Sequence, residues 1–287
     1  MEENKAIEEE KKVTKCLNCG TEFVGNFCPE CGQRADTTRF TVRFIFQNLL
    51  LGILSNDGGI WFTIKNLFTH PGQMMLDIIN GKRKSYFSPF PMLFLTLSLY
   101  VVIFSFTGSR EYNLELNNMT EKYSKAIENS SETEAAQAKN RIIRHGIFII
   151  SFCNDHYTAI MVLTIPVYIL AARLCYGRKN RRRYNWGEYC IPVVYSVIIF
   201  TLYRCISSIC FAFSVDFYET LYKWNWLVTV VAFTMCFKKM LDYRLAKMIW
   251  RSILLYVFYW ILLFMSIVFF GMIYVTTHYN DFRALAS

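Results

Sequence analysis

The sequence contains few charged residues, few histidines and none of the short motifs that mark common catalytic sites. Only 18% of its 287 residues are charged, whereas 54% are hydrophobic and 17% aromatic. This composition is too apolar for an ordinary soluble domain of this length. A glycine-rich phosphate loop, a nucleophile elbow and a His-Glu-x-x-His zinc motif are all absent. Since the four histidines also form no ligand pattern, we do not expect an enzyme.

The N-terminus also lacks the pattern of a secretory signal. Residues 1–15 carry nine charges, whereas a signal peptide begins basic and then becomes apolar. Such a charged stretch buries too little apolar surface to fold. We therefore expect a disordered leader over residues 1–15 that stays in the cytoplasm.

What the sequence does contain is a pair of C-x-x-C motifs, separated by eight residues, close to the N-terminus. Their four cysteines are Cys16, Cys19, Cys28 and Cys31. Four thiolates at this spacing can surround one metal ion tetrahedrally. Gly20 and Gly32 each follow a pair, and glycine permits the positive φ that turns the backbone N–H groups toward the sulfurs.

This spacing predicts a zinc ribbon over residues 16–35, with one structural Zn²⁺. Roughly twenty residues cannot bury enough apolar surface to fold alone, so a metal is the expected support. We expect a hairpin that turns at Gly25-Asn26, with Phe23 and Phe27 as its core. Iron would use the same ligands and remains an alternative. Redox activity is disfavoured because there are two pairs, and the absence of basic residues between Cys16 and Gln33 argues against nucleic-acid binding.

The apolar residues gather into five stretches, each close to the length that crosses a bilayer, about 20 residues. We therefore predict a mainly α-helical, polytopic transmembrane bundle over residues 89–276. The fourth stretch is the shortest, and Lys238 and Lys239 could extend it by snorkelling. The stretches run from Pro89 to about Phe106, from Tyr157 to Tyr176, from Tyr189 to about Phe213, from about Tyr222 to Phe237, and from Ile253 to Val275.

The charges between these stretches predict the orientation of the bundle. Two connections carry five basic residues each, whereas the segment 108–146 holds six bases and six acids and the segment 216–223 holds one base and two acids. Under the positive-inside rule, the N-terminus lies inside and the tail, residues 277–287, outside. The net charge of +9 is then explained by the basic residues on the inner side of the membrane, and it does not indicate nucleic-acid binding. A reducing cytoplasm would also keep the cysteines available for a metal.

Residues 36–88 join the ribbon to the bundle and show short helical patterns. Apolar residues recur at helical spacing over residues 41–54, around Trp61 and after Pro71. Each piece is too short to cross a bilayer. They are expected either to pack against the bundle or to lie in the inner membrane interface.

Lys82, Arg83 and Lys84 directly precede the first predicted span. The simpler interpretation is a positive-inside anchor. The alternative is a contact for an anionic lipid headgroup or a phosphate. Pro89 is expected at the first helical position of that span.

Arg204 lies within the third predicted span. An arginine at a helix centre costs about 2.5–3.5 kcal/mol on insertion scales, so a functional role deserves consideration. It lies fifteen residues after Tyr189, which is roughly 22 Å along a helix. It could instead snorkel outward or pair with an acid expected at the outer face, namely Asp155, Asp216 or Glu219.

Several segments together resemble an uncharacterised bacterial family whose members pair an N-terminal zinc ribbon with a multi-span membrane domain. The resemblance covers residues 16–105 and implies a bacterial inner-membrane location and a zinc site, but no activity. The residues that carry it are Cys16–Gly20, Phe27–Gln33, Pro71-Gly72-Gln73, Gly81–Lys84, Tyr86-Phe87 and Pro89-Phe90.

Our leading functional hypothesis is a non-enzymatic membrane protein whose cytoplasmic ribbon docks or regulates another protein. Its partners would be the lipid bilayer and one as yet unidentified protein, but no nucleic acid, and the sequence does not determine an oligomeric state. A small transporter or channel, with Arg204 facing an anion path, is the alternative. A lipid-acting membrane enzyme that uses residues 82–84 is a further alternative.

Overall fold

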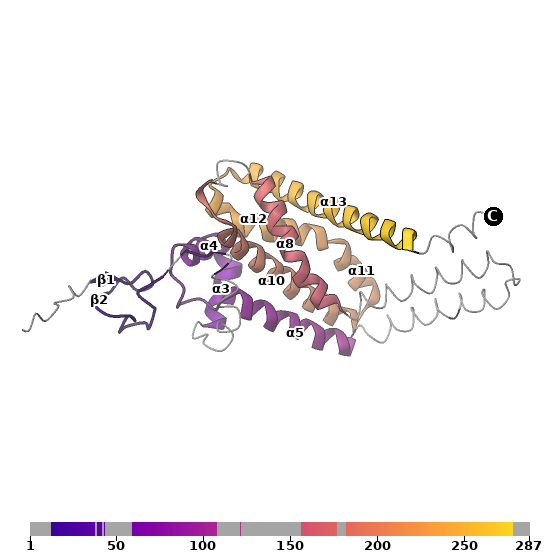
Figure 1. Ribbon diagram of the computed structural model, residues 1–287. Helices are drawn as coiled ribbons and strands as arrows, with labels where there is room; N and C mark the ends of the chain where they lie inside the picture. Colours follow the sequence, from indigo (N-terminus) through magenta and orange to yellow (C-terminus); the bar gives the residue numbers. More distant parts are fainter. Residues whose placement is uncertain are drawn as a thin grey trace, which may run out of the picture.

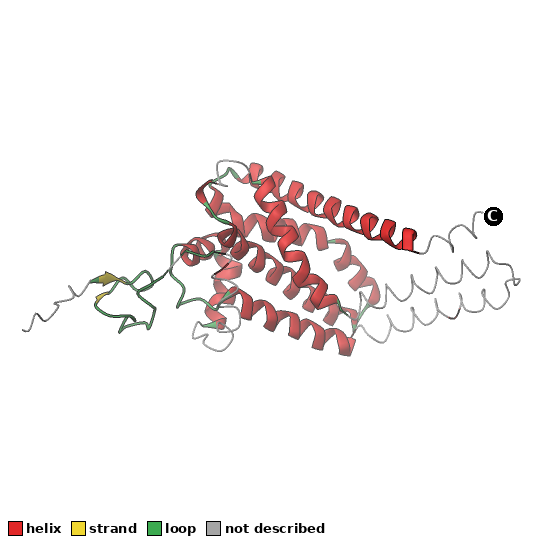
Figure 2. Ribbon diagram, in the orientation of Figure 1, coloured by secondary structure: helices red, strands yellow, loops and turns green. Residues whose placement is uncertain are grey.

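The computed structural model describes residues 13–37, 39–41, 43, 59–107, 121, 156–176 and 182–277. A small hairpin module stands at the N-terminal end, and helices make up most of the rest (Figures 1 and 2). The mainly helical fold with an N-terminal ribbon is therefore confirmed. Most of the predicted leader, nearly all of the predicted outside segment at 108–146, most of the helix expected over 41–54 and nearly all of the tail lie outside the described residues.

Strands in the ribbon pair around the cysteine motifs and not across Gly25-Asn26. β1 (Thr14–Lys15) is antiparallel to β2 (Glu22–Phe23), and an isolated bridge joins Phe27 to Arg34. Each pairing thus encloses one C-x-x-C turn, and the hairpin predicted at Gly25-Asn26 is wrong. The reason is that each turn brings its own flanking residues together, so the strand contacts form beside the cysteines.

The predicted ribbon core is half correct. Phe23 is buried, whereas 61% of Phe27 is exposed. Successive side chains of an extended segment point to opposite sides. Because Cys28 points inward and is 2% exposed, its neighbour Phe27 points outward.

Two short helices link the ribbon to the bundle. α3 (Ile60–Thr69) buries Thr63 and Leu67. α4 (Pro71–Ile79) begins at the predicted proline and buries the predicted apolar face, which comprises Met74, Met75, Ile78 and Ile79. α4 packs against α12 (Asn225–Leu241), which supports packing on the bundle. Trp61, in contrast, is 80% exposed.

Five long helices coincide with the five predicted apolar stretches. Three of them, α5 (Pro89–Thr107), α10 (Trp186–Phe211) and α13 (Leu245–Thr277), are long and apolar enough to cross a membrane. α8 contains a shorter apolar segment, Ala159–Cys175. Pro89 is the first residue of α5, as predicted. The helices are α5 (Pro89–Thr107), α8 (Tyr157–Cys175), α10 (Trp186–Phe211), α12 (Asn225–Leu241) and α13 (Leu245–Thr277).

The segment expected as an outer loop forms a separate helix, α11 (Val215–Lys223). The hydroxyl of Ser214 accepts a hydrogen bond from the backbone N–H of Phe217 and caps its start. Asp216 in the first turn and Lys223 in the last turn complement the helix dipole. α12 consequently begins at Asn225, three residues later than expected, and continues past Lys239 to Leu241.

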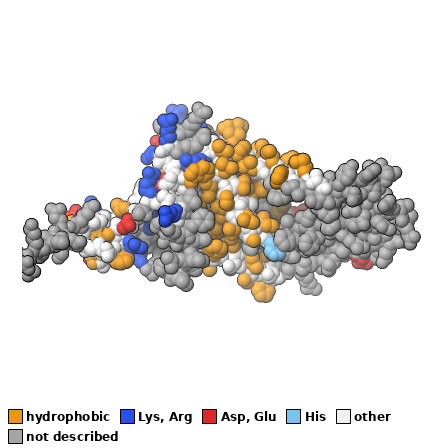
Figure 3. Space-filling model, in the orientation of Figure 1, with side chains coloured by type: hydrophobic (Ala, Val, Ile, Leu, Met, Phe, Trp, Pro, Cys, Tyr) orange, Lys and Arg blue, Asp and Glu red, His pale blue; other side chains and the backbone are white. Residues whose placement is uncertain are grey.

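α10 occupies the centre of the bundle and contacts α5, α8 and α12. Large aromatic side chains fill the space between these helices, and Tyr189, Tyr195, Phe233 and Phe237 are fully buried. In Figure 3, hydrophobic side chains cover the middle of the molecule, whereas lysines and arginines gather at the end nearer the ribbon. Among the described residues, this distribution is that of a membrane protein whose end toward the ribbon is basic.

Candidate metal centre

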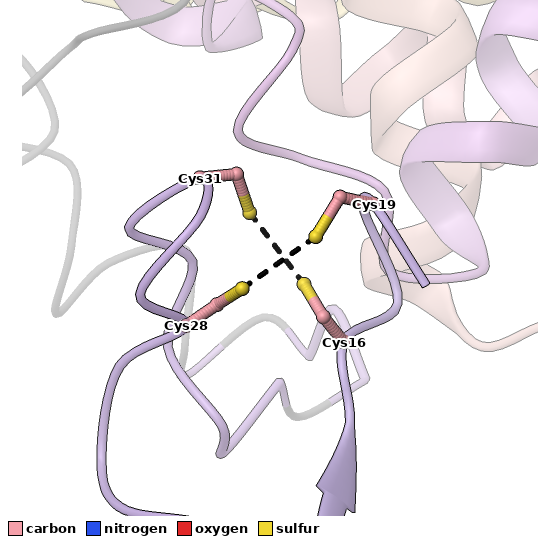
Figure 4. A group of neighbouring side chains, drawn as sticks. All are labelled: Cys16, Cys19, Cys28 and Cys31. Carbon is pink, nitrogen blue, oxygen red and sulfur yellow. Dashed lines mark hydrogen bonds between the residues drawn. The ribbon is translucent and has the colours of Figure 1, made fainter. Parts of the chain in front are cut away.

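The structure brings the four predicted cysteines together, and their sulfurs face one another (Figure 4). All four sulfurs lie within 4.8 Å of one another. The Sγ atoms of Cys16 and Cys31 are 3.5 Å apart, as are those of Cys19 and Cys28. Metal–sulfur bonds of about 2.3 Å at tetrahedral angles give sulfur separations of about 3.8 Å. The four side chains therefore form a possible metal-binding site.

Both C-x-x-C turns are built in the same way. Gly20 and Gly32 adopt φ values of +85° and +70°, as the sequence predicted. Their backbone N–H groups donate to the carbonyl oxygens of Cys16 and Cys28 at 2.9 and 2.8 Å. Any other residue at such a φ would be strained, so these glycines shape the turns that present the sulfurs.

The environment of the sulfurs suits a soft cation. Cys16 and Cys28 are buried, whereas Cys19 is exposed. Hydrogen bonding with Thr21 lowers the pKa of Cys19 to about 6, and burial raises the pKa of Cys31 to about 11. A bound cation would stabilise all four as thiolates, since metal ligation requires the deprotonated form. Zn²⁺ and iron both favour such a sulfur set.

The ribbon is fixed to the bundle through the connection between α4 and α5, residues 81–85, which we call the basic loop. Gln33 makes the central contact and is buried. Its side-chain amide donates to the carbonyl oxygen of Gly81 at 2.9 Å. Its side-chain oxygen accepts from the backbone N–H groups of Arg83 and Lys84 at 3.2 and 3.3 Å. The residue two positions after the last cysteine therefore orders the basic loop.

Asn18 and Leu17, which lie inside the first C-x-x-C motif, make a second set of contacts with the basic loop. The Asn18 side-chain oxygen accepts from the backbone N–H and the hydroxyl of Ser85. Gly81 has a φ of +104°, and a Cβ built there would lie 2.6 Å from the Leu17 Cδ1 atom. The basic loop thus needs glycine at position 81 for both conformation and space.

A family model matches residues 57–101. It describes a protein of unknown function (DUF3667). The match spans α3, α4, the basic loop and the first part of α5, which is half of the stretch 16–105 that the sequence analysis singled out, and it does not include the ribbon. No curated protein and no solved structure matches the chain.

The three basic side chains of the predicted lipid or phosphate site point to different neighbours. Lys82 Nζ lies 3.8 Å from an oxygen of Asp77. The Arg83 guanidinium lies 3.8 Å above the ring of Phe40. The Lys84 side chain lies close to Gly32 of the ribbon. They do not converge on one point, and their ligand contact stays a prediction.

An ion pair that the sequence analysis did not predict lies at the start of α10. Arg39 donates to both carboxylate oxygens of Glu188, each at 2.8 Å. The Glu188 carboxylate also accepts from the backbone N–H of Asn185, whose side chain accepts from the N–H of Glu188. The pattern Asn185-x-x-Glu188 before an apolar run is a capping box. That pattern could have revealed the helix start, but not the partner 149 residues away.

Arg204 lies among aromatic side chains from two other helices. Its guanidinium donates to the hydroxyl of Tyr100 at 3.1 Å and lies 5.6 Å from the ring centre of Tyr222. Tyr100 belongs to α5 and Tyr222 to α11, so Arg204 joins three helices. These contacts support a packing role, and the transport hypothesis stays a prediction. Asp155, one of its proposed acidic partners, lies outside the described residues.

Proposed function

We propose that the protein is a multi-pass bacterial inner-membrane protein whose cytoplasmic zinc ribbon docks a partner protein. The zinc ion would be structural, and the N-terminus would lie inside and the C-terminus outside. The basic loop and its positive neighbours support this orientation under the positive-inside rule. Among the described residues near the ribbon, no nucleophilic side chain lies beside a base in a catalytic arrangement. This favours binding over catalysis.

One observation carries this proposal. The ribbon uses Asn18 and Gln33 to hold the basic loop, yet it leaves Val24 49% and Phe27 61% exposed. A module with so small a core gains stability by burying apolar side chains, so two that remain exposed favour a contact with another protein. Aromatic side chains are also enriched where proteins bind one another.

The test compares proteins that co-purify with the full chain from membranes solubilised in mild detergent. Two variants disrupt the metal centre, Cys16→Ser and Cys31→Ser. A third, Val24→Ser with Phe27→Ser, removes the apolar contact while retaining the cysteines. Glu22→Gln is the matched control, because Glu22 is an exposed ribbon residue that the proposal does not use.

The proposal expects one partner that the wild type and Glu22→Gln retain and that all three other variants lose. Bound metal is measured in each preparation, so that loss of the partner in the Val24/Phe27 variant is not confused with loss of the ribbon. The same partners in every variant, or none with the wild type, would refute docking.

A further inference from the structure

A second candidate site lies where the segment after the ribbon meets the ends of two helices. A cavity of about 340 Å³ opens there between Thr37 and Arg39, the C-terminal end of α4 and the N-terminal end of α10. Ligand pockets commonly range from about 300 to 1,000 Å³. This volume therefore suits a small ligand or the head of a larger one. We call it the arginine pocket, because Arg39, Arg83 and Arg183 all line it.

The charge of the pocket favours an anion. Among the described residues that line it, Glu188 is the only acid, and both of its carboxylate oxygens accept from Arg39 at 2.8 Å. The three arginines and one glutamate leave a net charge of +2 on the lining. Because Glu188 is only 1% exposed, its charge is directed at Arg39 and away from the solvent.

Arg83 is held in place before any ligand arrives. Its guanidinium stacks 3.8 Å above Phe40, and its backbone N–H donates to Gln33. Burial lowers the pKa of Arg83 to about 10, and the charge of Glu188 partly opposes that shift. A preorganised, partly desolvated arginine gains more from an anion than a solvated one, since less order and less hydration remain to be lost.

We propose that the arginine pocket binds a phosphate group, with Arg83 and Arg183 as its principal contacts. Guanidinium groups bind phosphate oxygens through paired, charge-assisted hydrogen bonds. The phosphate could belong to an anionic lipid headgroup or to a soluble ion. The side chains of Asn80 and Tyr184 in the lining add polar and aromatic surface around it. This assignment replaces Lys82 and Lys84 of the sequence-based site with Arg39 and Arg183.

The test uses the purified full chain in nonionic detergent with two probes. Binding of inorganic phosphate is measured by titration calorimetry. The number of phosphatidylglycerol molecules bound from mixed micelles is measured by native mass spectrometry. Arg183→Gln removes an exposed pocket arginine with little risk to the fold. Arg182→Gln is the matched control, because Arg182 is an exposed neighbour that does not line the pocket. Arg83→Gln is the second variant, with metal content and thermal unfolding measured to check its fold.

Each pocket variant should weaken binding about tenfold or more, because each removes hydrogen bonds to a charged group, while Arg182→Gln stays close to wild type. If phosphatidylglycerol binds and inorganic phosphate does not, the pocket is a headgroup site. If inorganic phosphate binds, the pocket is a site for a soluble ion. The proposal is overturned if neither probe binds, if Arg182→Gln weakens binding as much as Arg183→Gln, or if Arg183→Gln binds like wild type.

Discussion

In the ribbon, the buried apolar cluster consists of Phe23 and two cysteines of the candidate metal centre, Cys16 and Cys28. In the bundle, one continuous cluster extends from α4 through α10 to α13 and includes five fully buried aromatic side chains. The first region is expected to depend on a metal, because its apolar surface is too small to hold it together alone. The second depends on packing. The two should therefore respond to different perturbations, even though Gln33 and Asn18 join them.

The largest expected effect comes from removing the metal. Cys28→Ser, or a strong chelator, should reduce the bound metal from one ion per chain to none and unfold residues 16–35. The binding free energy of a structural zinc is about 10 kcal/mol or more, and a ribbon this small has nothing to replace it. The ribbon should become sensitive to limited proteolysis, whereas helical circular dichroism should keep most of its amplitude.

The control is Glu30→Ser, which places a serine at an exposed ribbon position that is not one of the four cysteines. If the helical signal is lost together with the metal, the two regions fold as one unit and the contrast between them is wrong.

A smaller effect, confined to the other region, is expected from Phe237→Ala. Phe237 is fully buried and its ring centre lies 4.7 Å from that of Tyr176. Removing a buried phenyl ring leaves a cavity and costs about 3–5 kcal/mol. Denaturant unfolding in detergent should show this loss, and the metal content should not change.

Phe264→Ala is the matched control, since 67% of Phe264 is exposed and its removal leaves no cavity. If the two variants lose the same free energy of unfolding, packing around α12 does not dominate the stability of the bundle.

The smallest effect should come from the junction between the two regions. Gln33→Ala removes the side chain that holds the backbone of Gly81, Arg83 and Lys84, at a cost of about 1–3 kcal/mol because buried partners lose their hydrogen bonds. In the wild type, chelation should accelerate hydrogen exchange at the Arg83 and Lys84 amides. In Gln33→Ala this exchange should already be fast, and chelation should add little.

Asp36→Asn, at an exposed position after the ribbon, should exchange like wild type. Slow exchange at Arg83 and Lys84 in Gln33→Ala would show that the basic loop holds its own shape without the ribbon.

The features predicted from the sequence were those that follow from the spacing of one residue type or from a run of similar residues. The metal site follows from spacing within sixteen residues, and the helices follow from runs of apolar side chains. Pro71 and Pro89 marked two helix starts correctly because proline suits the first helical turn. In contrast, the exposure of Phe27 depended on where Cys28 points, and α11 depended on a local cap at Ser214 that composition alone does not reveal.

Contacts between residues far apart in the chain could not be predicted from the sequence. Gln33 and Gly81 are 48 residues apart, and Arg39 and Glu188 are 149 apart. A single sequence carries no information on which polar side chains will meet after the helices pack. The sequence did single out the basic loop, but the partners that shape it come from the ribbon and from α10.

The close approach at Gly187 has a mechanical consequence. A Cβ at this position would lie 2.5 Å from the carbonyl oxygen of Phe40, so the chain leaving the ribbon lies directly on the first turn of α10. Together with the basic loop, this gives the ribbon two points of attachment. A force exerted on the ribbon by a bound protein would reach the central helix through backbone contact, without a slack tether to absorb it.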